Sequence, residues 1–232
     1  MQSKTSADPP DQQHSPPTSG DRQQASHLHH MSADEIADAY ADVADTLDRW
    51  RRLDRLFAGR YRRRQFGDVS GRVLDVACGT GRNFRYLSSA TKVLGIDISE
   101  DLLAHARDEL DALGFEGHVQ QMDAQALDFP ADSFDTVVSS FSTCTFPDPV
   151  AALHEMERVC HPDGEIRLLE HSRSDAALLA WLQDRRAEAH YEKNGCRLNH
   201  EPLRTVQQAG LPVEDAATAC FGLVTAIDAT PR

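Results

Sequence analysis

A short glycine-containing segment, residues 73–81, carries the side chains best suited to binding chemistry. It reads Val-Leu-Asp-Val-Ala-Cys-Gly-Thr-Gly, with Asp75 at the end of an apolar run. Gly79 and Gly81 allow the backbone to approach a bound molecule closely. A helix beginning near Arg82 would point free N–H groups at a negatively charged ligand. This strand, glycine turn and helix would fit either a dinucleotide phosphate or the carboxylate of S-adenosylmethionine (SAM).

The residue three positions after Gly81 helps to separate these two ligands. Dinucleotide-binding turns carry a third glycine there, in the pattern G-x-G-x-x-G, whereas this chain has Phe84. A bulky ring at this position would obstruct the close approach of a diphosphate. The sequence therefore favours SAM over a nicotinamide dinucleotide.

Two more acidic residues follow the next two apolar runs. Asp97 lies about twenty residues beyond the loop, where a carboxylate can accept hydrogen bonds from both ribose hydroxyls, and Ile98 beside it can pack on adenine. Asp123 can accept a hydrogen bond from the adenine amino group, and the backbone N–H of Ala124 can donate one. Each acidic residue alone is equally consistent with a helix cap or a surface charge. Three of them at successive strand ends predict a cofactor site.

The elements that must position these residues follow from the hydropathy pattern after residue 72. Short apolar runs alternate with amphipathic stretches, which is typical of a parallel sheet covered by helices on both faces. Ser99 and Asp148 are suited to cap two of these helices, and a turn is expected at residues 161–164. Strands are predicted at 73–76, 92–96, 118–122, 136–139, 166–169, 213–219 and 223–228, and helices at 83–88, 100–113, 149–159, 175–193 and 201–209.

The residues before the glycine loop divide into a tail and a helical segment. Residues 1–31 are rich in Gln, Ser, Pro and Asp and are predicted to be disordered. The tail contains a short histidine cluster at 27–30, which is interpreted as incidental. Residues 32–66 are predicted to be helical, with Ser32 or Asp34 as the cap, and residues 67–232 to form the cofactor domain with a helical insertion at about 175–209. Apolar residues at helical spacing in the first helix are Ile36, Tyr40, Val43, Leu47 and Trp50.

Charge is distributed unevenly along the chain. The formal net charge is −13, with lysine only at Lys4, Lys92 and Lys193. Such a surface repels nucleic acid, so no DNA partner is predicted. The composition is consistent with a halophile-like acidic protein or with the base composition of its genome. Against this background, eight arginines at 49–64 form either a patch for an anionic substrate, lipid headgroup or RNA, or a solvated helix face paired with Asp.

The five cysteines are scattered and form no C-x-x-C pair, which indicates reduced thiols rather than a disulfide framework. Cys196 and His200 lack supporting ligands, so no metal is predicted. No apolar run is long enough to span a bilayer, and no signal-peptide pattern begins the chain. A cytoplasmic protein acting on a small-molecule substrate is expected, and its oligomeric state is not indicated.

Five ordered motifs are similar to those of a known family. They are V-L-D-V-A-C-G-T-G, G-I-D-I-S, Q-M-D-A, D-S-F-D-T-V-V-S-S and E-R-V-C-H-P-D-G-E-I-R-L-L-E-H. Over residues 33–229 the chain resembles the type-11 and quinone-methylating group of class I SAM-dependent methyltransferases. The resemblance implies an α/β, Rossmann-like, seven-stranded, mostly parallel sheet in the order 3-2-1-4-5-7-6, with the last strand antiparallel and helices on both faces. It also implies that Ala77 stands where the family more usually has glycine.

The resemblance and the residue pattern together define a predicted SAM site. The N-terminal helices are expected to form a lid, with Tyr40 nearest the cofactor. The predicted binding residues are Asp75, Ala77, Cys78, Gly79, Thr80, Gly81, Asp97, Ile98, Met122, Asp123, Ala124, Ser139 and Tyr40.

The methyl acceptor is less well defined than the cofactor. Residues 169–174, 181–184 and 194–203 resemble the branch that contains thiol S-methyltransferases, whereas residues 140–144 differ from the quinone enzymes. A thiol, a quinol or phenol, and a lipid amine all remain candidates. A SAM-binding regulatory or assembly protein without turnover, or an RNA methyltransferase, is the alternative. The Asn/Asp-Pro-Pro-aromatic run of amino-methylating DNA enzymes is not matched after the fourth strand.

One residue is a candidate general base. His171 follows the fifth predicted strand, at the edge where open α/β sheets bind ligands, and imidazole titrates near neutral pH. A histidine after a strand can equally be a structural hydrogen-bonding group. Further candidate pocket residues are Glu170, Tyr40, Ser142, Thr143 and Cys144.

Overall fold

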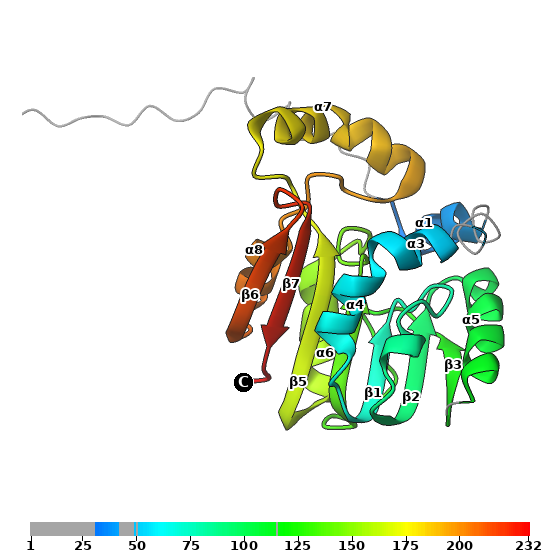
Figure 1. Ribbon diagram of the computed structural model, residues 1–232. Coiled ribbons are helices and arrows are strands. Elements are labelled where there is room, and N and C mark those ends of the chain that lie inside the picture. Colours follow the sequence, from blue (N-terminus) through cyan, green and yellow to red (C-terminus); the bar gives the residue numbers. More distant parts are fainter. Residues whose placement is uncertain (1–30, 42–48, 50, 115) are drawn as a thin grey trace, which may run out of the picture. The chain divides into compact units, whose positions relative to one another are not determined.

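The strands described by the structure form a seven-stranded sheet in the order β3-β2-β1-β4-β5-β7-β6 (Figure 1). Strands β1 to β5 run parallel, and β7 is antiparallel to both of its neighbours. The predicted order and the antiparallel last strand are therefore confirmed. The strands are β1 Gly71–Val76, β2 Ala90–Asp97, β3 Gly117–Gln121, β4 Phe134–Ser140, β5 Cys160–His171, β6 Val213–Ala219 and β7 Val224–Ala229.

The computed structural model describes residues 31–41, 49, 51–114 and 116–232. The predicted tail, 1–31, lies outside this range except for Met31, and so do Val43, Leu47 and Trp50 of the first predicted helix. The helical elements are α1 Ala33–Ala41, α3 Arg51–Phe57, α4 Gly59–Phe66, the 3₁₀ helix η1 Phe84–Tyr86, α5 Glu100–Leu113, α6 Pro149–Val159, α7 Ala177–Asn194 and α8 Pro202–Ala209.

Several helices begin where side chains cap their first N–H groups. Asp148 accepts hydrogen bonds from the first turn of α6, and Ser99 accepts one from the first turn of α5, as predicted. At the start of α1, Ser32 Oγ accepts from the Glu35 N–H while Glu35 accepts from the Ser32 N–H, which is a reciprocal capping box. Ser32, rather than Asp34, is therefore the cap of α1.

The central strands of the sheet are buried on both faces, as expected for parallel strands between helical layers, whereas the edge strand β6 is largely exposed. Leu74 and Val76 of β1 join one apolar cluster, which includes residues of α6 and α8. Val73 of the same strand joins a second cluster on the opposite face, with residues of α4, η1 and α5. Figure 1 shows α4 and α6 on opposite sides of the sheet. The two layers leave the carboxyl ends of β1, β2 and β3 at one common edge.

Two sequence predictions need correction. The helix predicted at 83–88 is only the three-residue η1, because the chain must reach β2 at Ala90 and because the Phe84 ring turns inward and is fully buried. The turn predicted at 161–164 lies inside β5. Phe134 pairs with Cys160 and Thr136 pairs with Glu165, so these four residues bulge out of the strand pairing without ending the strand.

Candidate cofactor and active site

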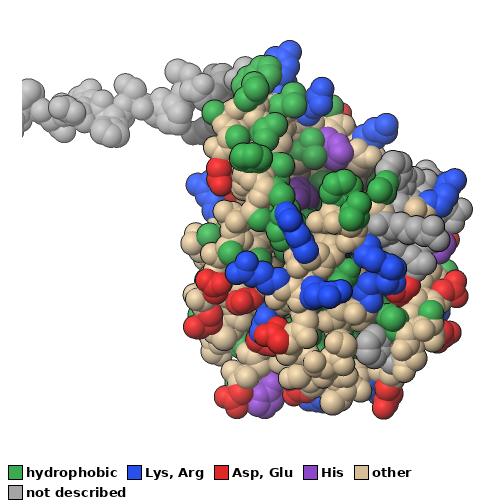
Figure 2. Space-filling view, in the orientation of Figure 1, with side chains coloured by type: hydrophobic (Ala, Val, Ile, Leu, Met, Phe, Trp, Pro, Cys, Tyr) green, Lys and Arg blue, Asp and Glu red, His purple; other side chains and the backbone are tan. Residues whose placement is uncertain are grey.

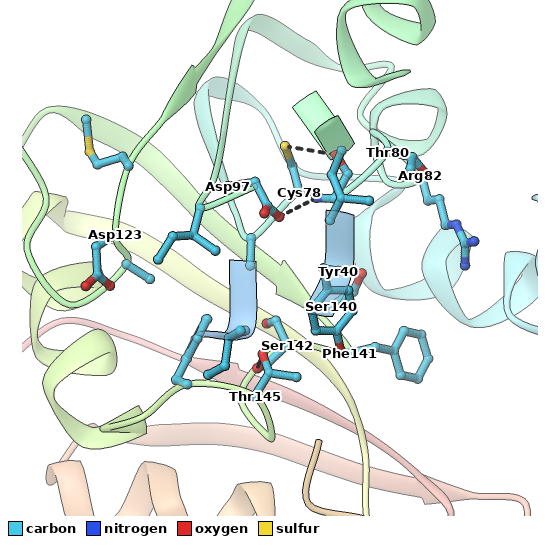
Figure 3. Close-up of a pocket in the computed structure, with 18 of the residues that line it drawn as sticks. Tyr40, Cys78, Thr80, Arg82, Asp97, Asp123, Ser140, Phe141, Ser142 and Thr145 are labelled. Atoms are coloured by element: carbon cyan, nitrogen blue, oxygen red, sulfur yellow. Dashed lines mark hydrogen bonds between the residues drawn. The ribbon is translucent and has the colours of Figure 1, made fainter. Parts of the chain in front are cut away.

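A cavity of about 360 Å³ lies at the common edge where β1, β2 and β3 end (Figure 3). The glycine loop, the residues that follow β2, β3 and β4, and parts of α1, α3 and α4 surround it. The residues that line it are Ala33, Ile36, Tyr40, Asp54, Ala58, Arg62, Ala77, Cys78, Gly79, Thr80, Arg82, Asp97, Ile98, Leu102, Met122, Asp123, Ala124, Ser140, Phe141, Ser142, Thr145, Phe146 and Pro147.

The glycine loop adopts left-handed backbone conformations at three positions. Ala77, Gly79 and Gly81 have φ angles of 53°, 56° and 75°. A Cβ atom placed on Gly79 would have no other atom within 4 Å, so this backbone position is open toward the cavity. Ala77 holds the same conformation with a side chain, which is strained for an L-residue. The predicted substitution of alanine for glycine is thus accommodated, but at an energetic cost.

The Phe84 ring fills the space between the glycine loop and β2. A Cβ on Gly81 would lie 2.7 Å from Phe84 Cε2, and a Cβ on Gly95 would lie 2.8 Å from Phe84 Cζ. The ring therefore leaves no room for a side chain at either glycine, and Gly81 also has a left-handed φ. This packing explains why the loop has only two of the three glycines typical of a dinucleotide turn.

Asp97 fixes the loop to the end of β2. Its Oδ2 accepts a hydrogen bond from the Gly79 N–H at 2.9 Å, drawn as a dashed line in Figure 3, and its Oδ1 accepts from the Ser99 N–H at 3.0 Å. Burial raises the pKa of Asp97, while these backbone donors and that of Ile98 act in the opposite direction. The carboxylate thus stands at the junction of the loop and the helix start.

A buried polar network lies beneath the loop. Asp75 Oδ1 accepts a hydrogen bond from Asn83 Nδ2 at 2.9 Å, and Asn83 Oδ1 accepts from Arg62 Nε and from Ser140 Oγ, both at 2.9 Å. Arg62 also donates to Asp54 at 2.6 Å. Burial raises the pKa of Asp75 to about 7, against the hydrogen bond from Asn83. The network joins β1, η1, β4 and the α3–α4 segment at the cavity.

Sequence reasoning missed Arg62, Asn83, Asp54 and Phe141. The guanidinium of Arg62 lies over the Phe141 ring, 5.2 Å from its centroid, and Phe141 itself has a left-handed φ of 55° directly after β4. The arginine-rich segment was the available signal, because Arg62 is one of its eight arginines. Its pattern did not distinguish the buried Arg62 from the exposed Arg63.

Two buried side-chain oxygens of the described residues have no hydrogen-bond partner, Asp75 Oδ2 and Thr80 Oγ1. Thr80 lines the cavity, whereas Asp75 lies behind the loop. A hydroxyl donor and a carboxylate acceptor are suited to the carboxylate and ammonium groups of an amino acid. Together with the open face of Gly79 and the acidic residues Asp97 and Asp123, these residues fit SAM.

Most of the predicted cofactor residues come together in this cavity. Ten of them line it: Tyr40, Ala77, Cys78, Gly79, Thr80, Asp97, Ile98, Met122, Asp123 and Ala124. Asp75, Gly81 and Ser139 lie behind the lining, and Ser139 Oγ donates to the Val76 carbonyl at 2.7 Å. Tyr40 is largely buried, which raises its pKa. Residues of α1 form part of the cavity wall. That residues 32–66 cover the bound cofactor as a lid stays a prediction.

The candidate pocket residues near β5 do not all line the cavity. Ser142 lines the cavity, but Glu170, Thr143, Cys144 and His171 do not. The fully buried Glu170 carboxylate accepts hydrogen bonds from the backbone N–H groups of Ser142 at 3.0 Å and Thr143 at 3.3 Å. Burial raises the pKa of Glu170 to about 7, against the charge of His171. Glu170 therefore holds the segment after β4 in place from behind.

His171 contacts two cysteines instead of the cavity. Its Nε2 lies 3.2 Å from Cys196 Sγ, which lies 3.5 Å from Cys144 Sγ. Hydrogen bonds from Cys144 and His171 lower the pKa of the Cys196 thiol to about 4. Burial lowers the pKa of His171, but the hydrogen bond and charge of Cys196 outweigh it and raise that pKa. This position does not favour the predicted role of His171 as a base that reaches an acceptor in the cavity.

Comparisons with known proteins agree with this geometry. A family model described as a methyltransferase domain matches residues 73–164. A phosphatidylethanolamine N-methyltransferase of Cereibacter sphaeroides is 41% identical over 115 residues, covering 49% of this chain and 57% of that protein. A ubiquinone/menaquinone biosynthesis C-methyltransferase of Pseudomonas fluorescens is 34% identical over 167 residues, covering 66% of this chain and 64% of that protein. The chain spans 40% to 64% of the length of the first curated relatives it matches.

Solved structures share the fold at low sequence identity. A chain from the complex of the Trm112 methyltransferase activator with a methyltransferase of Haloferax volcanii gives a TM-score of 0.68 at 18% identity, covering 83% of this chain and 98% of that one. A SAM-dependent methyltransferase from Thermotoga maritima gives 0.66 at 20% identity, covering 85% and 100%. The fold and loop are thus those of Rossmann-like methyltransferases. Residues 73–164 match a methyltransferase domain, and the relatives support a class I SAM-dependent methyltransferase similar to the type-11 group.

Proposed function

We propose that the protein transfers the methyl group of SAM to a small-molecule acceptor bound in the cavity of about 360 Å³. The proposal rests on one observation. The glycine loop, Asp97 and Asp123 line the same cavity as Tyr40 and the segment after β4. When bound, SAM supplies a methyl group on a positively charged sulfur, which is already activated toward an acceptor lone pair.

The residues of the loop and strand ends have distinct proposed roles toward the cofactor. Asp97 accepts from the ribose hydroxyls, and Asp123 accepts from the adenine amino group. The Gly79 backbone and Thr80 hydroxyl face the amino-acid portion, supported by the unpartnered Thr80 Oγ1. Asp75 balances the ammonium charge from behind the loop.

The remaining cavity wall is suited to hold an acceptor. Phe141 and Phe146 offer apolar surfaces, while Tyr40 and Ser142 offer hydroxyls beside them. Holding the acceptor in line and excluding water can contribute up to about 7–11 kcal/mol in favourable cases. An acceptor with a free lone pair needs no general base, whereas an amine or a quinol must also lose a proton. Because His171 lies outside the cavity lining, we propose that this proton passes to solvent.

The surface favours an amphiphilic acceptor, such as a lipid amine or a quinol with an apolar tail. Large hydrophobic side chains are exposed on α3 and α7 and in the β6–β7 turn, and where such side chains form a contiguous patch they mark an interaction site. Figure 2 shows hydrophobic side chains over α7 and the adjacent edge of the sheet, with Lys and Arg side chains between them. The exposed large hydrophobic residues of α3, α7 and the β6–β7 turn are Leu53, Leu56, Phe57, Leu178, Leu179, Trp181 and Phe221.

The relatives are consistent with this choice of acceptor. One is named for phosphatidylethanolamine and another for ubiquinone and menaquinone biosynthesis. None of the described helices is long and apolar enough to cross a membrane. The exposed side chains of α3 and α7 are the surface that we propose an amphiphilic acceptor contacts.

The test combines cofactor binding with turnover. Isothermal titration should detect SAM binding, and the full chain should release S-adenosylhomocysteine with an amphiphilic amine or quinol more rapidly than with a short-chain analogue of the same headgroup. Thiols and phenols complete the acceptor panel. Absence of SAM binding would refute the proposal, and binding without product for any acceptor would instead support a regulatory protein. Preference for the short-chain analogue would refute the amphiphilic acceptor.

A further inference from the structure

Three potential metal ligands from distant parts of the chain converge behind the cavity. Cys144 follows β4, His171 ends β5, and Cys196 lies in the loop between α7 and α8. Their ligating atoms, two Sγ and one imidazole nitrogen, all lie within 4.8 Å of one another. From the sequence, Cys196 and His200 alone are too few ligands for a metal, and none was predicted; His200 Nε2 lies 3.0 Å from Thr143 Oγ1.

The spacing of these atoms matches a tetrahedral ion. Zinc–sulfur bonds are about 2.3 Å and zinc–nitrogen bonds about 2.0–2.1 Å, which places ligand atoms about 3.5–3.8 Å apart around one ion. The observed separations are 3.5 Å between the Cys144 and Cys196 sulfurs and 3.2 Å between Cys196 Sγ and His171 Nε2. The third separation, between Cys144 Sγ and the His171 imidazole, is within 4.8 Å, so the ligands would adjust their positions around a bound ion.

The backbone holds the three residues in this arrangement. The Arg197 N–H donates to the Cys144 carbonyl at 3.2 Å, which fixes the loop of Cys196 against the segment after β4. His171 is paired with Val224 in the sheet, so its backbone is held by β7. Because sheet and loop pairings position the ligands, the site is preorganised for its ion.

We propose that Cys144, His171 and Cys196 form a Cys₂His zinc site with one open coordination position. Two thiolates and one imidazole are the donor set that selects zinc over magnesium or calcium. Cys144 is flanked in sequence by residues of the cofactor cavity, Ser142 and Thr145. The ion joins the segment after β4, the end of β5 and the α7–α8 loop, and its open position accepts water or an external donor.

Metal binding can be measured without reference to methyl transfer. The full chain, reduced and freed of metal with a chelator, is titrated with Zn²⁺ in competition with a chromophoric chelator, and in parallel with Co²⁺. One equivalent should bind, and Co²⁺ should give tetrahedral ligand-field bands together with a thiolate charge-transfer band. Cys196→Ser should weaken zinc binding by at least about 100-fold, since even the loss of an outer partner of a ligand costs 10- to 100-fold.

Three further variants make the result specific. Cys220→Ser removes an exposed thiol outside the cluster and should bind zinc like the unmodified chain. Replacing His27, His29 and His30 by alanine removes the histidine cluster of the N-terminal segment and should also leave the affinity unchanged. His171→Ala provides a second ligand variant if Cys196→Ser does not fold, as judged by near-ultraviolet circular dichroism.

Several outcomes would overturn the proposal. These are the absence of zinc binding by the reduced chain, a Co²⁺ spectrum without thiolate charge transfer, and undiminished affinity in both ligand variants. If removing the three N-terminal histidines abolished zinc binding, the ion would be held by those histidines and not by Cys144, His171 and Cys196. A Cys144–Cys196 disulfide that forms in air, with no zinc affinity after reduction, would assign the pair to redox chemistry.

Discussion

The Asp97 carboxylate accepts a hydrogen bond from the backbone N–H of Gly79 at 2.9 Å, which joins the end of β2 to the loop after β1. Its second oxygen accepts from the Ser99 N–H at the start of α5. One side chain thereby sets the relative positions of the loop and of the strand end that together form the cofactor wall. The two proposed functions of Asp97, shaping the loop and binding ribose, act through the same carboxylate.

Asp97→Ala should therefore weaken SAM binding by about 10- to 100-fold, since hydrogen bonds to a charged group contribute about 1.5–3 kcal/mol. Isothermal titration measures the change directly. Asp101→Ala, two residues into α5 and exposed, is the matched control and should bind SAM like the unmodified protein. Equal affinities for the two variants would contradict the assignment.

Arg62 is tied to the site by hydrogen bonds to Asn83 and Asp54. Arg62→Ala should lower the free energy of unfolding by about 1–3 kcal/mol, because the buried Asn83 and the partly buried Asp54 lose a charged hydrogen-bond donor. Urea unfolding gives the comparison with Arg63→Ala, whose side chain is exposed. If both substitutions cost the same, the network does not stabilise the fold.

Substitutions of Ala77 would measure the energetic cost of the left-handed backbone conformation at this position of the glycine loop. An L-residue in this conformation costs about 1–2 kcal/mol, which glycine avoids, although glycine adds entropy to the unfolded chain. Ala77→Gly should therefore leave the free energy of unfolding unchanged or raise it by up to about 1 kcal/mol. Ala77→Val should lower it by more than about 1 kcal/mol, because a β-branched side chain tolerates this conformation poorly. A glycine variant clearly less stable than the parent would argue against strain at this position.

Glu170 should make stability depend on pH. Its pKa is raised in the fold from 4.5 to about 7, so the folded protein binds more protons than the unfolded chain between these values. This contribution to stability is fully present below pH 4.5 and is lost as the pH rises through 7. Glu170→Gln keeps an oxygen acceptor for Ser142 and Thr143 without the titration, and should flatten this part of the profile.

Unfolding free energies measured across pH 4.5–7.5 would show the difference between the variant and its parent. Glu188→Gln, on an exposed position of α7, is the control and should leave the profile unchanged. Asp75, with a pKa also raised to about 7, should keep a residual slope in the Glu170 variant. Parallel profiles for parent and Glu170→Gln would show that Glu170 does not titrate in this range.

The sheet and much of the cofactor wall could be predicted from local sequence. The helices α5 and α6 begin where Ser99 and Asp148 predict, because caps act over one turn. Asp97 and Asp123 meet because the carboxyl ends of parallel strands share one edge, so their position follows once the strands are recognised.

The rest depends on contacts that no local pattern contains. Whether Arg62 or Arg63 turns inward depends on Asn83, which comes 21 residues after Arg62 in the chain. Cys144 and Cys196 are 52 residues apart, and the sequence interpretation missed their approach because it considered spacing along the chain alone. The helix predicted after the glycine loop was wrong because the inward rotation of Phe84 is a tertiary event.

Helix α4 is fastened at two distant points, by Arg62 to Asn83 beside the glycine loop and by Gln65 to Asp228 and the Ile227 carbonyl of β7. A segment anchored in this way is matched to the residues that it contacts. In a chimera, an α4 without an arginine and a glutamine at these two positions would leave Asn83 and Asp228 without these hydrogen bonds. Recombination within this group should therefore succeed most often when the N-terminal helices and the last strand come from the same parent.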